Sequence, residues 1–198
     1  KGGSASLTMK FRIIAFTATI AMLFVPYVLS GGPTMTGVEK VEVNGIENFS
    51  QLEGMSGFAG TKIGFGGATQ AVAMASLKRE GFVTVINLRL ADEENIDLQG
   101  NGGAARAAGL NYIHLPFDTS APATDVVNKF LTIVGNEENQ PVYVHCGSAT
   151  RAAALWMIGR VLVDNWEVSA ASAEVERIAR KPGDAIAFAT GYIESHEK

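Results

Sequence analysis

Residues 142–156 read VYVHCGSATRAAALW, and this stretch decides the fold. An apolar, β-branched run ends at Cys146, four small residues follow, and a second apolar run begins near Arg151. A short and continuously apolar run is typical of a buried strand in a parallel sheet. The second run continues to Val163, which is the length of a helix rather than of a strand. The stretch therefore predicts a buried strand, a tight loop and a helix in direct succession.

The same succession recurs along the chain. The patterns predict strands at residues 61–67, 82–88, 111–116 and 141–146, and helices at residues 69–79, 98–109, 125–134, 151–163, 168–180 and 183–195. Alternating strands and helices favour a mostly parallel central sheet with helices on its faces. The predicted fold class is α/β, with about four to five strands in a domain of residues 58–198. Residues 31–57, rich in Gly, Ser, Thr and Asn, are expected to form an N-terminal arm or a short edge strand.

The N-terminal segment, residues 9–30, has the layout of a secretory signal peptide. Lys10 and Arg12 precede an almost wholly apolar run over residues 13–29, and small residues follow it. We expect a cleaved signal or a retained anchor, either of which places the domain in the periplasm or outside the cell. Membrane contact is expected only through this segment. Residues 1–8 precede a methionine and are expected to be a cloning remnant or an upstream extension.

The composition and the charge exclude several classes of protein. Hydrophobic residues make up 47% and charged residues 18%, which excludes an intrinsically disordered chain. The net charge of −4 gives no electrostatic support for nucleic-acid binding. The single cysteine excludes an internal disulfide, and with only three histidines it gives no basis for a structural zinc site.

Sites in such sheets form beyond the carboxyl ends of the strands. Three loops of this chain meet that condition, namely residues 89–97, 117–124 and 146–151, and the only cysteine lies in the third. A buried, inert cysteine at a strand end is the plain alternative to a functional thiol. A functional thiol is favoured by two features: small residues follow Cys146, and an arginine stands at the start of the next helix.

The third loop combines several features that bind anions. Its small side chains allow a tight curl that points backbone amides inward, and the helix that follows adds partial positive charge. Arg151 supplies a planar fork of donors that suits a tetrahedral oxyanion. These features favour the thiolate form of Cys146 and place an anion in front of its sulfur. The pattern therefore indicates a substrate that is a phosphate or a sulfur oxyanion.

Asp118 follows Leu115-Pro-Phe117 at the end of the preceding predicted strand. A carboxyl group at that place could protonate a leaving oxygen in front of Cys146 and then act as a base for water. An Asx-turn is the alternative role, because Thr119, Ser120 and Pro122 make a turn-like context.

With these residues the chain resembles the cysteine-dependent protein tyrosine and dual-specificity phosphatases. It resembles most closely the small bacterial phosphatase-like proteins described as beta-lactamase-hydrolase-like. The resemblance covers about residues 58–160. It is carried by residues 63–67, 77–89 (LKREGFVTVINLR), 110–118 (LNYIHLPFD) and 142–156.

The resemblance implies a role for each residue of the site. Cys146 is the nucleophile that forms a phosphocysteine, Arg151 binds the equatorial oxygens, and Asp118 is the general acid. His145 orients the loop and helps to keep the thiolate. The amides of the phosphate-binding residues complete the cradle, namely Gly147, Ser148, Ala149, Thr150 and Arg151. The resemblance implies no metal and no organic cofactor, because the arginine and the amides stabilise the charge.

Three features depart from the usual phosphatase loop. Four residues rather than five separate Cys146 from Arg151, a length also seen in many rhodanese sulfurtransferases. Ala149 stands where a glycine is frequent, which restricts any positive φ at that point. Ala152 stands where a hydroxyl residue is frequent, so Ser148 and Thr150 could supply a hydroxyl instead.

The sequence supports three hypotheses. The first is a phosphatase that hydrolyses phosphate monoesters through a phosphocysteine, with a phosphorylated protein (phosphotyrosine or another residue) or a small molecule as partner. The second is a rhodanese-like sulfurtransferase with a Cys146 persulfide. The third is a weakly active oxyanion-binding module. Asp118 discriminates between the first two, because cleavage of a phosphate ester needs an acid and sulfur transfer does not.

Overall fold

The computed structural model describes residues 2, 37–121 and 124–196. The chain divides into two units, residues 1–32 and 33–198, and the description below concerns the second. The signal peptide or anchor predicted at residues 9–30 lies outside the described residues. In the described part of the chain, no helix combines the length and the apolar character needed to cross a membrane.

The described residues form a six-stranded sheet in the order β1-β2-β3-β6-β4-β5. The strands are β1 (Glu39–Lys40), β2 (Ser50–Glu53), β3 (Lys62–Gly66), β4 (Thr84–Asn87), β5 (Asn111–His114) and β6 (Val142–His145). Strands β3, β6, β4 and β5 are parallel, whereas β1 and β2 are antiparallel. The predicted α/β class is confirmed, and the four predicted strands form the parallel part of the sheet.

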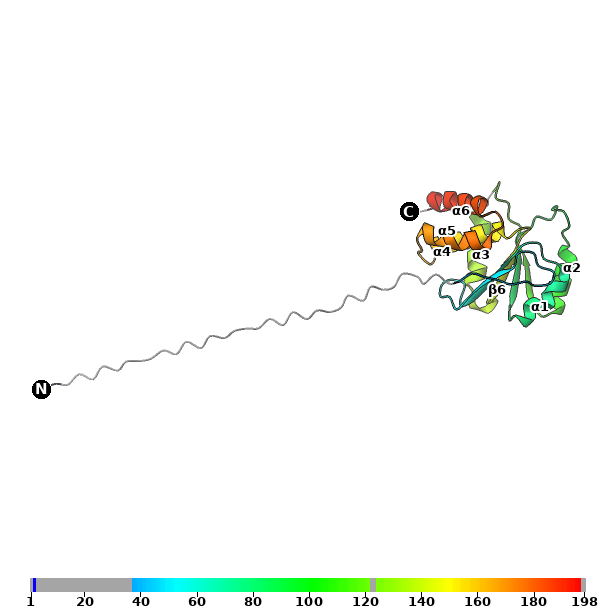
Figure 1. The fold of residues 1–198 in the computed structure, drawn as a ribbon, viewed down its shortest axis with the longest axis horizontal. Helices are drawn as coiled ribbons and strands as arrows, with labels where there is room; N and C mark the ends of the chain where they lie inside the picture. Colours follow the sequence, from blue (N-terminus) through cyan, green and yellow to red (C-terminus); the bar gives the residue numbers. More distant parts are fainter. Residues whose placement is uncertain (1, 3–36, 122–123, 197–198) are drawn as a thin grey trace. The chain divides into compact units, whose positions relative to one another are not determined.

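Helices cover both faces of the sheet (Figure 1). They are α1 (Met74–Arg79), α2 (Leu98–Ala107), α3 (Thr124–Gly135), α4 (Thr150–Leu162), α5 (Val168–Ile178) and α6 (Pro182–His196), with short 3₁₀ turns at Ala71–Ala73 and Glu137–Asn139. Helices α1 and α2 bury one cluster of side chains against the sheet, and α3 to α6 bury a larger cluster on the other face. All six predicted helices are present, and α5 and α6 pack mainly against α4.

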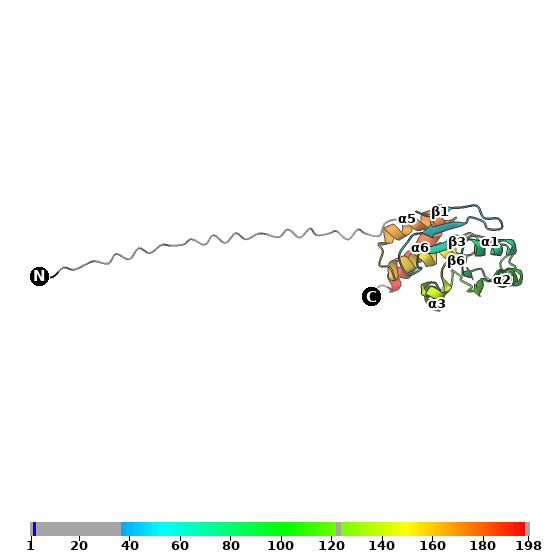
Figure 2. The same cartoon turned by 90° about the horizontal axis from the view of Figure 1, so that it is seen from below.

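Residues 38–57 contain the short edge strand that was one of the two expectations, β1, and they are not a separate arm. Strand β2 pairs with β3 along its whole length, and Phe49, Leu52 and Met55 are buried. The Arg177 side chain donates a hydrogen bond to the Val38 carbonyl, so that the segment is tied to α5 (Figure 2). The folded domain therefore begins before residue 58, the boundary expected from the sequence.

Helix α4 is buried over most of its length and carries a charged network at its C-terminal end. The Arg160 guanidinium is fully buried between the rings of Trp156 (4.3 Å) and Trp166 (4.1 Å). It forms ion pairs with Asp164 (2.9 Å) and Glu174 (3.1 Å). Removing one partner of a buried pair costs about 3–5 kcal/mol, so this network fixes the helix whose first turn carries Arg151.

Candidate active site

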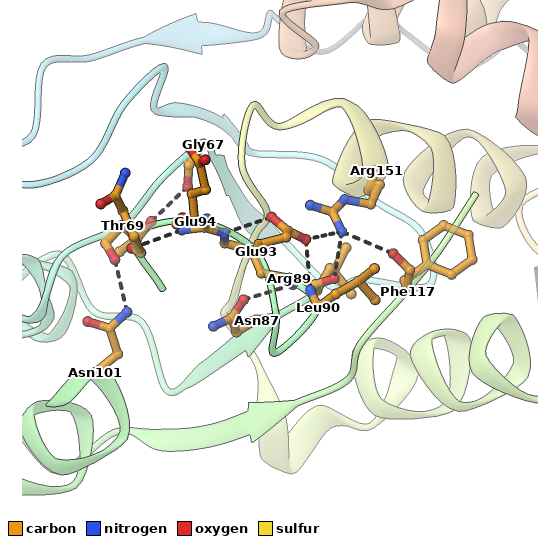
Figure 3. A network of polar contacts seen from close by, with 12 residues as sticks. Gly67, Thr69, Asn87, Arg89, Leu90, Glu93, Glu94, Asn101, Phe117 and Arg151 are labelled. Atoms are coloured by element: carbon orange, nitrogen blue, oxygen red, sulfur yellow. Dashed lines mark hydrogen bonds and ion pairs between the residues drawn. The ribbon is translucent and has the colours of Figure 1, made fainter. Parts of the chain in front are cut away.

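The three loops predicted to form a site meet at the Arg151 guanidinium. Its Nη1 donates hydrogen bonds to the carbonyl oxygens of Leu88 (3.2 Å) and Phe117 (3.1 Å). The same nitrogen lies 2.6 Å from Oε1 of Glu93. Leu88 and Glu93 follow β4, Phe117 follows β5, and Arg151 follows β6, so the parallel strands bring these loops to one edge of the sheet (Figure 3).

The loop after β6 is held from two sides. The Cys146 amide donates to the Gly66 carbonyl (3.2 Å), and the Gly147 carbonyl accepts from Ala68 (3.1 Å). The Ser148 carbonyl accepts from the amide of Arg180 (3.2 Å), which lies between α5 and α6. Both carbonyls are engaged by the structure around the loop, as expected for a loop whose amides are to face a ligand.

A pocket of about 250 Å³ opens in front of this loop. Its lining comprises Phe117, Asp118, Thr119, Ser148, Thr150, Arg151, Ala154, Lys181, Asp184 and Ala185. The pocket thus brings together Arg151, Asp118 and both loop hydroxyls, as the sequence predicted. Cys146 is only 1% exposed and is not among the residues that line the pocket. Burial lowers the pKa of Arg151, but Glu93 and then Cys146 raise it above its ordinary value.

Glu93 contacts the site, although the sequence favoured a solvated position for it over one at the rim of the pocket. Its carboxylate bridges the two arginines, because Oε2 lies 2.9 Å from Nε of Arg89 while Oε1 pairs with Arg151 (Figure 3). It also accepts a hydrogen bond from the Leu90 amide (2.7 Å). Burial alone would raise the pKa of Glu93, but the hydrogen bonds from Arg151, Leu90 and Arg89 bring it down to about 2. Glu93 is therefore ionised at neutral pH and fixes the orientation of Arg151.

His145 is fully buried at the end of β6, with its ring parallel to that of Tyr143. Neither ring nitrogen has a hydrogen-bond partner among the described residues. Burial, the largest influence, lowers the pKa of His145 to about 3. The imidazole is therefore neutral at pH 7 and supplies no positive charge to a thiolate, which limits its predicted role to orienting the loop.

The comparisons with known proteins agree with this geometry. Residues 64–163 match the family model for the phosphatase-like domain of beta-lactamase hydrolase-like proteins. The chain belongs to this family.

A curated protein that carries the name of this family is similar to the chain. The beta-lactamase hydrolase-like protein of Agrobacterium fabrum (strain C58 / ATCC 33970) is 30% identical over 122 residues, which are 60% of this chain and 27% of that protein. The chain thus corresponds to about a quarter of the relative's length. The family resemblance inferred from the sequence is confirmed, and it concerns the phosphatase-like domain.

Solved structures share the fold. A proposed phosphatase (DUF442) from Shewanella putrefaciens CN-32 has a TM-score of 0.59 at 21% identity and covers 78% of this chain and 96% of its own. The core of the PP-IP phosphatase SIW14 from S. cerevisiae scores 0.58 at 22% identity, over 79% and 89% of the two chains. TpbA from P. aeruginosa, in complex with pTyr, scores 0.55 at 17% identity, over 79% and 87%. At these identities the likeness shows the fold alone.

One departure of this phosphatase-like domain from the usual loop is absorbed by the backbone. Ala149 adopts φ 62° and ψ −3°, a left-handed conformation, although it carries a β-carbon. The sequence predicted that the alanine restricts a positive φ, and the structure shows that it does not. A residue other than glycine costs about 1–2 kcal/mol in this region.

The structure places Asp118 at the pocket, in the Asx-turn that the sequence offered as its alternative role. Its carboxylate lines the pocket of the phosphatase-like domain, and its Oδ1 accepts hydrogen bonds from the amide (2.8 Å) and the hydroxyl (2.7 Å) of Ser120. The hydrogen bonds from Ser120, and to a lesser extent the charge of Arg151, lower the pKa of Asp118. In this arrangement the carboxylate is stabilised, so the acid form that a leaving group requires is disfavoured.

The described residues contain no group of three or more His, Cys, Asp or Glu side chains placed to hold a metal ion. The charged side chains that line the pocket are those of Arg151, Lys181, Asp118 and Asp184.

Proposed function

We propose that this domain hydrolyses phosphate monoesters through a phosphocysteine intermediate. One observation carries the proposal: Arg151, locked by Glu93 and two carbonyl groups, lies in a pocket that Asp118 also lines, and the buried Cys146 begins the same loop. An arginine fixed before the substrate arrives stabilises an equatorial oxyanion without the cost of reorganisation.

The proposed reaction has two steps. The Cys146 sulfur attacks phosphorus, the bond to the ester oxygen breaks, and Asp118 gives its proton to the leaving oxygen. Asp118 then takes a proton from water, whose oxygen attacks the phosphocysteine and releases inorganic phosphate and the thiolate. Arg151 and the amides of residues 147–151 hold the phosphoryl oxygens, and His145 orients the loop. The charge stabilisation of this route comes from the chain itself, so the proposal includes no cofactor.

The first substrate to test is phosphotyrosine, because the structure of TpbA contains pTyr. Other phosphoproteins and small phosphate esters form the second group. If residues 9–30 act as a signal or as an anchor, these substrates are met in the periplasm or outside the cell.

Sulfur transfer is the second candidate, and two observations favour it. The loop has four residues between Cys146 and Arg151, and the Asp118 carboxylate is held in its ionised form by Ser120. In this reaction the Cys146 thiolate takes the outer sulfur of thiosulfate, releases sulfite, and passes the persulfide sulfur to an acceptor such as cyanide. No step needs a general acid, so a carboxylate held in its ionised form is no obstacle.

The experiment measures both activities on the same preparation, as hydrolysis of 4-nitrophenyl phosphate and formation of thiocyanate from thiosulfate and cyanide. We expect phosphate ester hydrolysis that is lost in Cys146→Ser. Thiocyanate formation without ester hydrolysis would replace the proposal by the sulfurtransferase. Neither activity, with anion binding retained, would identify an oxyanion-binding module.

A further inference from the structure

Lys181 lies in the wall of the candidate active site, although it is far from the catalytic loop in the sequence. It stands between α5 and α6, directly after Arg180, whose amide donates a hydrogen bond to the Ser148 carbonyl at 3.2 Å. This contact joins the connection between the two helices to the catalytic loop. Lys181 consequently lines the same pocket as Arg151 and Asp118.

The Lys181 ammonium group differs from the neighbouring cations in having no carboxylate partner. Arg151 pairs with Glu93, and Arg180 lies 3.7 Å from a carboxylate oxygen of Glu47. Within the described part of the chain, no carboxylate lies within 4.0 Å of Lys181, including Asp184 in the same pocket. Lys181 therefore brings a positive charge to the pocket that the protein itself does not pair.

We propose that Lys181 determines substrate specificity by binding a second anionic group, a carboxylate or a further phosphate, on the molecule whose phosphate is held by Arg151. The inference rests on the proposed function, since it assigns the substrate class of the same pocket. Arg151 and Lys181 line the same pocket of about 250 Å³, so a single small substrate can present one anionic group to each of them. Asp184 repels an anion placed beside Lys181, so it limits the strength of this contact.

The experiment compares two chromogenic esters, 4-nitrophenyl phosphate and its 3-carboxy derivative, on the full chain. Lys181→Met keeps the length of the side chain and removes its charge, and Arg180→Met removes the adjacent charge outside the pocket. We expect Lys181→Met to lower kcat/KM for the carboxylated ester about fivefold more than for the plain ester, the effect of one exposed charge pair. Arg180→Met should leave the ratio unchanged, and Asp184→Asn should raise it. An unchanged ratio in Lys181→Met overturns the inference.

A binding measurement separates this inference from the proposed function. If the wild-type chain turns over neither ester, the phosphatase proposal fails, and the dissociation constants of pyrophosphate and orthophosphate measured by calorimetry still test Lys181. We expect pyrophosphate to bind more tightly than orthophosphate, and we expect Lys181→Met to remove about fivefold of that advantage. Equal affinities for the two anions, or an advantage that survives the substitution, overturns the inference.

Discussion

Two arginines of helix α4, nine residues apart, are held by carboxylates in different ways. Arg160 is fully buried, and each of its three guanidinium nitrogens contacts an acceptor: Nε and Nη2 contact Glu174, and Nη1 contacts Asp164. Arg151 is 18% exposed, and its ion pair with Glu93 and both bonds to carbonyl oxygens involve Nη1. Its Nη2 lies on the loop side, 3.9 Å from the place where a β-carbon at Gly147 would stand.

The difference separates a structural arginine from one that is available to a ligand. An arginine whose donors are all satisfied by the protein can only stabilise the fold. Removing Arg160 takes away the cation that neutralises Glu174 and Asp164, although both carboxylates keep other hydrogen bonds. An arginine fixed through one nitrogen keeps the rest of its planar fork for an oxyanion. The two ends of α4 should therefore respond to substitution in opposite ways, one in stability and the other in activity.

The largest effect is expected on stability, for Arg160 at the buried C-terminal end of α4. Arg160→Met leaves Glu174 and Asp164 without their shared cation, and we expect the free energy of unfolding to fall by about 3–5 kcal/mol. Urea denaturation at pH 7 measures the loss, and kcat/KM below the transition should stay within about twofold of wild type, as expected for a site that the change does not touch. A loss below about 1 kcal/mol would contradict the assignment of Arg160 as a structural anchor.

Substitution of Arg151, in the first turn of α4, should affect activity more than stability. Arg151→Lys keeps the positive charge but loses the planar fork, and we expect kcat/KM for 4-nitrophenyl phosphate to fall by about 10²–10³. The melting temperature should change little, because the lysine can still reach one of the acceptors. A large loss of stability with activity retained would show that Arg151, like Arg160, is structural.

Glu93 tests whether the orientation of Arg151 matters. Glu93→Gln removes the charge that holds both arginines, and we expect about a tenfold loss of kcat and a loss of stability of about 1–2 kcal/mol at pH 7. The pKa of Glu93 is about 2 in the folded chain and 4.5 in the reference state, so its stabilising contribution is complete above about pH 4.5 and is lost as the pH falls towards 2. The difference in unfolding free energy between wild type and Glu93→Gln should shrink between pH 5 and pH 3. A difference independent of pH would show that ionisation of Glu93 does not stabilise the fold.

The parts of this molecule that the sequence predicted are those in which the local pattern and the tertiary structure agree. The runs at residues 82–88 and 141–146 are apolar on both faces because helices cover both faces of the sheet, and this made the parallel strands recognisable. The order of the elements then placed the three loops together, since the carboxyl ends of parallel strands meet at one edge.

Other features depend on contacts that no local pattern encodes. Strand β2 reads SQLE, and its buried Ser50 and Gln51 conceal the apolar alternation that would have identified a strand. The sequence favoured a solvated Glu93 over one at the rim of the pocket, because a carboxylate four residues after an arginine in a loop is usually solvated. Lys181 was missed because its nearness to the loop after β6 depends on the contact between Arg180 and Ser148, 32 residues apart.

The smallest effect is expected at Ala149, where the loop meets α4. Ala149→Gly relieves left-handed backbone strain, which stabilises the fold by about 1–2 kcal/mol. It also removes a buried methyl group, which costs about 0.8 kcal/mol of stability. The greater freedom of glycine in the unfolded chain costs about 0.5–1 kcal/mol more. We expect these terms to cancel to within about 1 kcal/mol, with kcat/KM changed less than about threefold, because the backbone conformation is retained.

Ala152→Gly is the matched control, because Ala152 is equally buried but lies within α4. It has no strain to relieve, so it should cost about 2 kcal/mol through helix propensity and the lost methyl group. The difference between the two variants in urea denaturation isolates the strain at Ala149. Equal losses would mean that the positive φ costs nothing. The four-residue loop would then reach its conformation without strain, and the alanine would have to be counted as a neutral replacement for glycine.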